Sequence, residues 1–285
     1  MVSATAGRVT IEEGVIFGSG GGRDLKCDIY TPPAETANGA GVLIIHGGGW
    51  ARGDRKQLRG YGILLGRKGY AGVACEYRLS GEAKWPAQLH DVKTALRWMR
   101  ANAARLGIDP AKIAVEGNSA GGHLSLMLAG TQNMAAFEGE GGNAGAGTEV
   151  AAAIAFYAPV LLGRTRTEHE VRVEGSDVVG QLLGDDISEA RLREASPVTH
   201  VNASNPPTLL FTGNKDHLVP AAASFRMYEA LNAAGAPVEL HTYNGAPHAF
   251  DAVPELGRQC ADIMALFLDR HVVRPRPVEP PKTTI

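Results

Sequence analysis

Residues 111–130 hold the sequence feature that most constrains how this chain can fold. A short run of β-branched and apolar residues leads directly into the pattern Gly-x-Ser-x-Gly at Gly117–Gly121, and an apolar run follows at 124–129. This order predicts a buried strand, a sharp turn and a helix that packs on a sheet. Glycine is needed on both flanks of the turn because side chains there would collide with neighbouring elements. The pattern therefore predicts that Ser119 stands at the tip of a strand-to-helix turn, at the positive end of the following helix.

Strand and helix patterns alternate along most of the chain. The strand patterns at 9–17 and 25–30 are separated by the glycine run Gly18–Gly22, which is typical of an antiparallel hairpin. The run at 40–45 is apolar on both faces, as in a central parallel strand. Further strands are expected at 71–77, 151–157, 206–213 and 238–243, and helices at 55–68, 88–102, 221–234 and 253–270. The alternation predicts an α/β chain with a mostly parallel, doubly wound sheet flanked by helices.

We expect residues 1–272 to form one domain. The chain has 285 residues, and α/β folds of this size are commonly one unit with a large core. The stretch from about 160 to 205 is polar and weakly periodic, and its length suits a small helical insertion that caps one end of the sheet. Residues 273–285 are rich in proline, which predicts an extended or disordered tail.

Composition disfavours several classes of partner and site. The formal net charge is −2 and charged residues make up 20%, so we expect no nucleic-acid partner. The three cysteines lie far apart without Cys-x-x-Cys spacing, so we interpret them as buried apolar residues rather than a disulfide framework or a zinc site. No apolar run approaches the roughly 20 residues of a membrane span, and the start of the chain lacks the pattern of a signal peptide. We therefore expect a cytoplasmic protein with no membrane partner, leaving secretion open if the sequence has been trimmed at its start.

Two loops after predicted strands offer partners for Ser119. A serine hydroxyl is a poor nucleophile near neutral pH, so a base must take its proton and a third group must orient that base. Asp216 follows the strand at 206–213, and His248 follows the strand at 238–243. Because the carboxyl ends of parallel strands meet at one edge of a sheet, the sequence predicts a catalytic triad of Ser119, Asp216 and His248.

Other acids and histidines compete for these two roles. Asp185 and Asp186 lie in the predicted cap, and Asp251 follows the histidine rather than preceding it, so all three are less well placed as the acid. His217 adjoins Asp216 and should point elsewhere, whereas His241 lies within a strand, below the catalytic end. Taken alone, Asp216 also suits a turn and His248 an ordinary surface position.

The glycine run at residues 46–50 predicts a second part of the site. The tetrahedral intermediate of acyl transfer carries an oxyanion, and glycines let backbone N–H groups approach it without an intervening side chain. We assign the oxyanion hole to the N–H groups of Gly48, Gly49 and Ala120. A phosphate-binding loop is the alternative, but neither glycine cluster reads Gly-x-Gly-x-x-Gly or ends in Gly-Lys-Ser/Thr. His46 is expected to brace the loop, and Trp50 either lines an acyl pocket as a substrate-binding residue or packs in the core.

These motifs together resemble a known family. His46–Trp50, Tyr77–Leu79, Gly117–His123 and the loops of Asp216 and His248 are similar to those of hormone-sensitive-lipase-type carboxylesterases of the α/β-hydrolase superfamily. The match is nearest to the branch of bacterial acetyl-xylan and feruloyl esterase-like enzymes and kynurenine formamidases, and it covers roughly residues 25–270. The resemblance implies an α/β-hydrolase fold with an eight-stranded sheet, ester hydrolysis without a metal or cofactor, and a preference for short acyl groups.

Two departures from the lipase-like members disfavour long-chain lipid substrates. Asn118 stands where those proteins often have aspartate, and no long helical segment precedes the first strand to build a large cap. Arg78 and Asp91 also recur in the resembling pattern, and we interpret them as a structural ion pair at the sheet edge.

The resemblance implies a serine carboxylesterase that acts through an acyl-enzyme intermediate on short acyl esters, with carbohydrate acetyl and feruloyl esters as candidates. A formamide or amide hydrolase on the same triad stays open, because selectivity depends on how the cap folds over the site. A non-catalytic ligand-binding protein is the alternative of another class, since the gibberellin receptors resemble this family. Such proteins usually lose a triad member, and all three positions are filled here. An exposed edge strand would also allow a homodimer.

Overall fold

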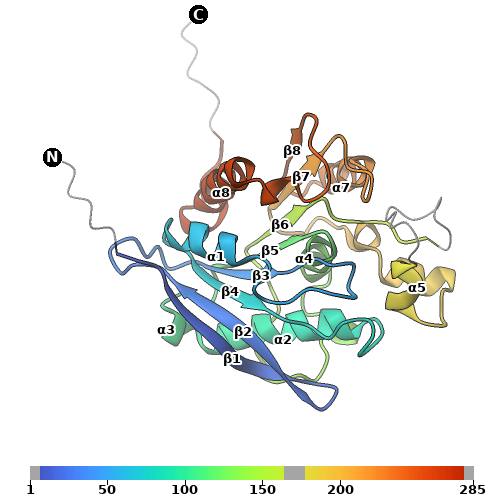
Figure 1. The fold of residues 1–285 in the computed structure, drawn as a ribbon, viewed down its shortest axis with the longest axis horizontal. Helices are drawn as coiled ribbons and strands as arrows, with labels where there is room; N and C mark the ends of the chain where they lie inside the picture. Colours follow the sequence, from blue (N-terminus) through green and yellow to red (C-terminus); the bar gives the residue numbers. More distant parts are fainter. Residues whose placement is uncertain (1–6, 164–176, 279–285) are drawn as a thin grey trace, which may run out of the picture.

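The computed structural model describes residues 7–163 and 177–278, which are built around one eight-stranded sheet (Figure 1). The spatial order of the strands is β1-β2-β4-β3-β5-β6-β7-β8. Strand β2 pairs antiparallel with both of its neighbours, and every other pair is parallel. The strands are β1 (Thr10–Gly20), β2 (Arg23–Thr31), β3 (Gly41–Ile45), β4 (Ala71–Cys75), β5 (Ile113–Asn118), β6 (Ala152–Phe156), β7 (Thr208–Gly213) and β8 (Val238–Tyr243). The predicted fold class and sheet are confirmed.

The hairpin of β1 and β2 is tighter than the sequence suggests. Glycines 18 and 20 belong to β1, and only Gly21 and Gly22 form the turn. Both turn residues have positive φ, at 59° and 82°, which is the backbone of the two-residue turns that match the right-handed twist of antiparallel strands. Glycine is favoured at both positions because side chains rarely adopt that conformation.

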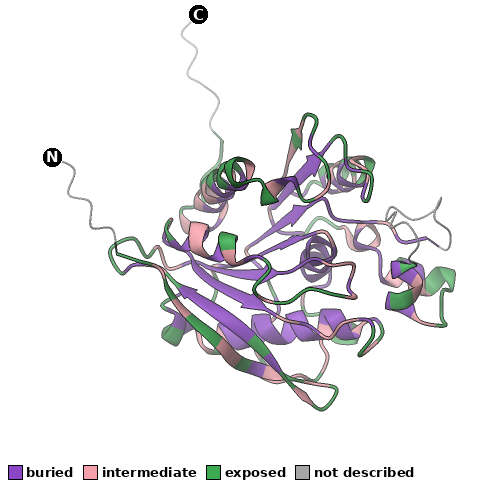
Figure 2. Cartoon of the chain, viewed as in Figure 1, coloured by how far each residue is buried: buried purple, intermediate pink, exposed green. Residues whose placement is uncertain are grey.

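Two layers of helices cover the sheet, because the central strands are apolar on both faces. In β3, Val42 and Ile44 pack with α1 and α8, whereas Leu43 and Ile45 pack with α2 and α4 on the opposite face. Figure 2 shows the buried residues concentrated in these strands, with exposed residues along β1 and the outer faces of the helices. The helices are α1 (Arg59–Gly66), α2 (Ala87–Ala101), α3 (Ala103–Leu106), α4 (Ala120–Gly130), α5 (Val178–Leu183), α6 (Glu189–Glu194), α7 (Ala222–Ala233) and α8 (Pro254–Leu268), with short helical turns η1 (Ala135–Phe137), η2 (Pro197–His200), η3 (Phe250–Ala252) and η4 (Asp269–Val273).

Three predicted segments need comment. Helix α1 begins at Arg59 rather than near residue 55, because residues 55–58 form turns. Within the predicted cap, the described part holds α5, α6 and η2, while residues 164–176 lie outside the described residues. Residues 279–285 of the predicted tail also lie outside them. None of the helices in the described part of the chain combines the length and apolar character needed to cross a bilayer.

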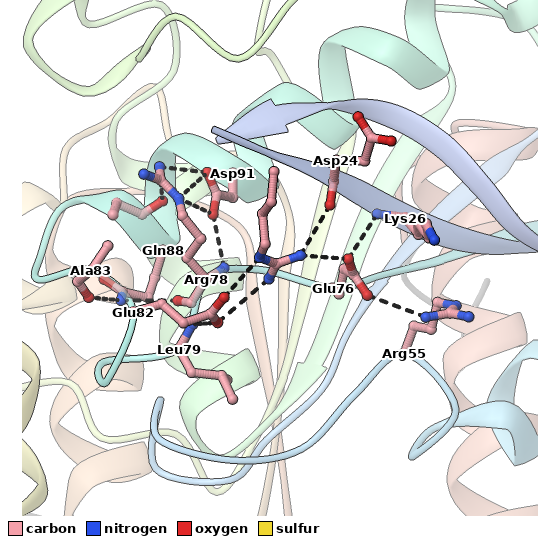
Figure 3. A network of polar contacts seen from close by, with 12 residues as sticks. Asp24, Lys26, Arg55, Glu76, Arg78, Leu79, Glu82, Ala83, Gln88 and Asp91 are labelled. Carbon is pink, nitrogen blue, oxygen red and sulfur yellow. Dashed lines mark hydrogen bonds and ion pairs between the residues drawn. The ribbon is translucent and has the colours of Figure 1, made fainter. Parts of the chain in front are cut away.

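A polar network braces the sheet edge and the loop after β3 (Figure 3). Arg78 donates to both carboxylate oxygens of Asp91 through Nε and Nη2, at 2.8 and 2.7 Å, which confirms the predicted ion pair. Arg55, which follows the glycine loop, donates to Glu76 at 3.2 Å and to the fully buried Asp28 at 2.7 Å. Buried charged hydrogen bonds of this kind are costly to break on one side, so the exit of the glycine loop is held against β2 and β4.

Candidate active site

The turn between β5 and α4 carries Ser119. The residue has a φ of 56°, a strained conformation for a side chain other than glycine, and its N–H donates to the Phe156 carbonyl of β6 at 2.9 Å. A Cβ atom added at Gly121 would lie 2.0 Å from the Ile45 carbonyl oxygen, and one at Gly117 would lie 2.4 Å from the Gly121 carbonyl oxygen. Close backbone approach therefore explains both flanking glycines.

His248 lies between Ser119 and Asp216. Its Nε2 is 3.1 Å from the Ser119 Oγ, and its Nδ1 is 2.7 Å from the Asp216 Oδ2. Since a carboxylate only accepts, Nδ1–H donates to Asp216 and Nε2 is left to accept the serine proton. The other oxygen of Asp216 accepts the N–H groups of Leu218 and Val219, each at 2.9 Å, and the residue is only 6% exposed. The structure thus brings the three predicted residues into one line for proton transfer.

The competing acids and bases lie away from this line. Asp185 and Asp186 are exposed in the turn after α5, and Asp251 accepts its hydrogen bonds from residues other than His248. His217 is exposed, while His241 sits within β8 with its ring 5.5 Å from that of Phe211. None of these five side chains is hydrogen bonded to Ser119 or His248 in the described part of the chain.

The glycine loop after β3 lies beside the nucleophile. Among the described residues, none accepts a hydrogen bond from the N–H groups of Gly48, Gly49 or Ala120. Gly48 and Gly49 have positive φ, at 108° and 60°, and a Cβ atom on Gly48 would lie 2.1 Å from the Arg52 carbonyl oxygen. The three free donors, one of them at the start of α4, are suited to bind an oxyanion.

A cavity of about 980 Å³ adjoins these groups. Ser119 and His248 lie in its wall together with the glycine loop, and the described part of the cap contributes Val178 and Gln181. The rest of the wall comes mainly from α1, η3 and the start of α8, with Tyr157 after β6 and Leu218 and Val219 after β7. The arrangement can therefore hold a carbonyl substrate with its oxygen near the free N–H groups.

Comparison with known proteins identifies the family. The family model BD-FAE matches residues 27–231. The chain belongs to the BD-FAE family. Esterase LipC of Mycobacterium tuberculosis is 32% identical over 249 residues, covering 85% of this chain and 60% of LipC, so the chain spans about three fifths of that relative's length.

Solved structures agree with the family. A truncated form of a carbohydrate esterase from gut microbiota has a TM-score of 0.81 at 26% identity, covering 93% of this chain and 98% of its own. Thermogutta terrifontis esterase 2, phosphoramylated by tabun, has a TM-score of 0.77 at 26% identity, covering 97% and 100%. The resemblance inferred from the motifs, to esterases of the α/β-hydrolase superfamily, is confirmed.

In this BD-FAE chain, Trp50 is a core residue. Its indole is 1% exposed, and its Nε1–H donates to His123 Nδ1 at 3.3 Å. Trp50 is not among the described residues that line the cavity beside Ser119. Trp50 has a positive φ of 58°, and the next residues, Ala51 and Arg52, are again in the cavity wall. The proposed substrate-binding role of Trp50 is therefore corrected to a packing role.

His46 braces the loop, as the sequence suggested. Its ring is stacked on that of Tyr77 with 4.3 Å between centroids, and its Nδ1 lies 2.8 Å from the Gly47 carbonyl oxygen. The Tyr77 hydroxyl donates to the His46 carbonyl at 3.1 Å. These contacts hold the start of the glycine loop against Tyr77, which follows β4.

His123 joins three parts of the site as a neutral imidazole. Its Nδ1 accepts from Trp50, so the proton lies on Nε2, which donates to the Ala195 carbonyl of the cap at 2.8 Å. The ring has no exposed surface, and burial lowers its pKa from 6.5 to about 4. A second proton would have to enter at Nδ1 and would break the bond from Trp50.

Stability of the folded chain is expected to fall as the pH drops from about 6.5 to about 4. The folded pKa of His123 lies below its unfolded value, so the unfolded chain takes up the proton first and gains free energy over this range. The stabilisation is complete above pH 6.5, and its loss approaches about 3 kcal/mol near pH 4. Urea unfolding at pH 7.5, 6.0 and 4.5 measures the effect.

His123→Gln tests the source of that loss, because an amide can donate and accept without titrating. The variant should be less stable than the wild type at pH 7.5 but show a shallower decline towards pH 4.5. His217→Gln, at an exposed histidine, should leave the decline unchanged. Equal slopes in His123→Gln and the wild type would contradict the assignment.

Asp251 belongs to the site, although the sequence analysis considered it only as a competing catalytic acid. Its Oδ2 accepts from Asn118 Nδ2 at 2.6 Å and from the Tyr61 hydroxyl at 3.0 Å, and its Oδ1 accepts from the Tyr157 hydroxyl at 2.5 Å. The ring of Tyr157 lies 4.4 Å from that of His248. One carboxylate thus joins the residue before the nucleophile, the end of β6, helix α1 and the loop of the catalytic histidine. Asn118, the residue before the nucleophile, supplies a donor to this carboxylate.

Glu116 lies in β5, three residues before Ser119. It is fully buried, and neither carboxyl oxygen has a hydrogen-bond partner among the described residues. Burial, with a smaller contribution from the charge on Asp251, raises the pKa of Glu116 well above its usual value. The side chain is therefore a neutral acid beneath the turn.

In the described part of the chain, no group of three His, Cys, Asp or Glu side chains is arranged to hold a metal ion.

Proposed function

We propose that this BD-FAE chain is a serine carboxylesterase. The observation that carries the proposal is the line of hydrogen bonds from Asp216 through His248 to Ser119, beside three N–H groups that have no acceptor among the described residues. Ser119 attacks the ester carbonyl while His248 takes its proton, and Asp216 stabilises the imidazolium. Gly48, Gly49 and Ala120 bind the oxyanion, and water then releases the acyl group from Ser119 by the same route.

The comparisons support this reaction class. LipC is named an esterase, and one solved structure that is similar over 97% of this chain is an esterase phosphoramylated by tabun. That chemistry is expected of an enzyme with an activated nucleophile, and Ser119 is the group of this chain that is placed for it. The presence of all three triad residues weighs against a non-catalytic ligand-binding role.

For the substrate, we propose short acyl esters, with acetyl or feruloyl esters of carbohydrates as the natural candidates. The similar structure of a carbohydrate esterase supports the second part. The cavity beside Ser119 is large enough for more than an acetyl group, so the test uses esters of different acyl-chain length.

A substrate panel tests the proposal. We expect hydrolysis of p-nitrophenyl acetate, falling activity along the series to the decanoate, and acid release from acetylated xylan or a feruloyl ester. N-formylkynurenine belongs in the same panel, because a formamide hydrolase would use the same triad. Cleavage of that substrate without cleavage of any ester would replace the esterase proposal with a formamidase.

A further inference from the structure

The cavity beside Ser119 continues away from the reacting groups between α1 and α8. The α1 side of its wall includes Leu58, Ile63 and Leu64, and the α8 side includes Pro254. The wall reaches Arg67, the residue that follows α1. Gly60 is also in the wall, and the seven residue steps from Gly60 to Arg67 correspond to a rise of about 10 Å along the helix axis, at 1.5 Å per residue. A substrate could therefore extend well beyond its ester group along a largely apolar surface.

Three arginines lie in the wall of this one cavity: Arg52, Arg67 and Arg258. They come from the glycine loop, the end of α1 and the first turns of α8, and all three are exposed. No ion pair or hydrogen bond joins their guanidinium groups to any described residue. Most other described arginines, among them Arg55 and Arg97, do form ion pairs.

The acidic residue in the same wall forms no ion pair with these arginines. Asp251 is engaged by Asn118, Tyr61 and Tyr157, which leaves its two oxygens committed beneath the site. Asp262, which is near the far end of α1, pairs with Lys68 instead. The cavity thus presents three guanidinium groups that have no ion-pair partner among the described residues.

From this charge pattern we infer that the chain selects esters that carry a second, ionised acid group, a carboxylate or a phosphate, at a distance of several bonds from the scissile carbonyl. The inference rests on the proposed esterase activity and names its substrate class. Guanidinium groups bind both kinds of oxyanion through paired N–H donors. The apolar wall along α1, from the site towards Arg67, receives the hydrocarbon or aromatic part that joins the two groups.

The expected preference is moderate because the arginines are exposed. Exposed ion pairs are individually weak, so we expect the arginines together to give a preference on the order of tenfold in kcat/KM. Salt screens such pairs, so the preference should shrink as ionic strength rises while the neutral substrate is affected less.

Paired esters that differ only in charge test the inference. On the acyl side, the p-nitrophenyl monoester of suberic acid is compared with the same compound capped as its methyl ester. On the alcohol side, 8-acetoxyoctanoate is compared with its methyl ester, and 8-acetoxyoctyl phosphate separates phosphate from carboxylate recognition. The readout is the ratio of kcat/KM for the charged ester over the neutral one, at low and high salt. We expect a ratio near ten on at least one side at low salt, falling at high salt.

Variants assign the preference to the arginines. In the triple variant Arg52→Gln, Arg67→Gln and Arg258→Gln, the ratio should fall to about one. Arg193→Gln is the matched control, because Arg193 is also exposed, its side chain has no partner among the described residues, and it lies outside the cavity. The control should keep the wild-type ratio.

A ratio of one in the wild type on both the acyl and the alcohol side, or an unchanged ratio in the triple variant, would overturn the inference while leaving the esterase proposal intact. Failure to cleave any of these esters, neutral or charged, would overturn the proposed function itself.

Discussion

Replacing Ser119 with alanine is expected to lower kcat/KM for p-nitrophenyl acetate by at least about 10⁴-fold. The reason is that no other hydroxyl in the described part of the chain is hydrogen bonded to His248 Nε2, which lies 3.1 Å from the Ser119 Oγ. The free N–H groups stay in place, so the residual rate reports the oxyanion hole alone. Steady-state hydrolysis and far-UV circular dichroism measure activity and folding on the same samples.

Covalent labelling gives an independent measurement of the same prediction. A fluorophosphonate probe should attach to Ser119 in the wild type and to nothing in Ser119→Ala. Ser204→Ala is the control, since Ser204 is an exposed serine in the loop before β7, and it should keep both labelling and turnover. Retention of more than a few per cent of activity in folded Ser119→Ala would reject the assigned nucleophile.

Asp216→Asn is expected to lower kcat/KM by about 10⁴-fold with little change in the fold. The Asp216 Oδ1 accepts two backbone N–H groups, so the amide oxygen of asparagine should take that position. Its NH₂ group would then face His248 Nδ1, which must become the acceptor. The ring proton would move to Nε2, where it prevents the histidine from taking the serine proton.

Asp185→Asn serves as the matched control, because Asp185 is an exposed acid of the cap that the sequence could not dismiss. It should retain nearly full activity. Nearly full activity in Asp216→Asn, or a large loss in Asp185→Asn, would move the role of the acid to another residue. Thermal unfolding of both variants separates a catalytic effect from misfolding.

Local signals predicted the elements of the site well. The flanking glycines of Ser119 and the glycine loop after β3 follow from backbone collisions that any strand-to-helix turn of this kind must avoid. Asp216 and His248 could be found because the loops after neighbouring parallel strands, here β7 and β8, meet at one edge of the sheet. Helix α1 was placed too early, since turn residues and helix residues share the polar composition around residue 55.

The sequence did not predict the roles of residues that act through contacts with distant parts of the chain. Nothing near Trp50 indicates that its indole turns inward to His123, because that contact depends on how α4 packs behind the loop. Asp251 was considered only as a competing acid, although its position after His248 could have suggested a second role in the same loop. The arginines of the cavity lie at residues 52, 67 and 258, and no local pattern connects them.

Sequence alone determined which predicted strand each reacting group follows, the strained turn at Ser119, and the assignment of serine, histidine and acid. Each of these follows from short-range sterics or from the chemistry of a single side chain. Tertiary structure decided which way Trp50 turns, which groups Asp251 joins, and which charges gather along the cavity. These depend on side chains that are far apart in the chain and become neighbours only when the helices pack on the two faces of the sheet, so their identities could not be read from local pattern.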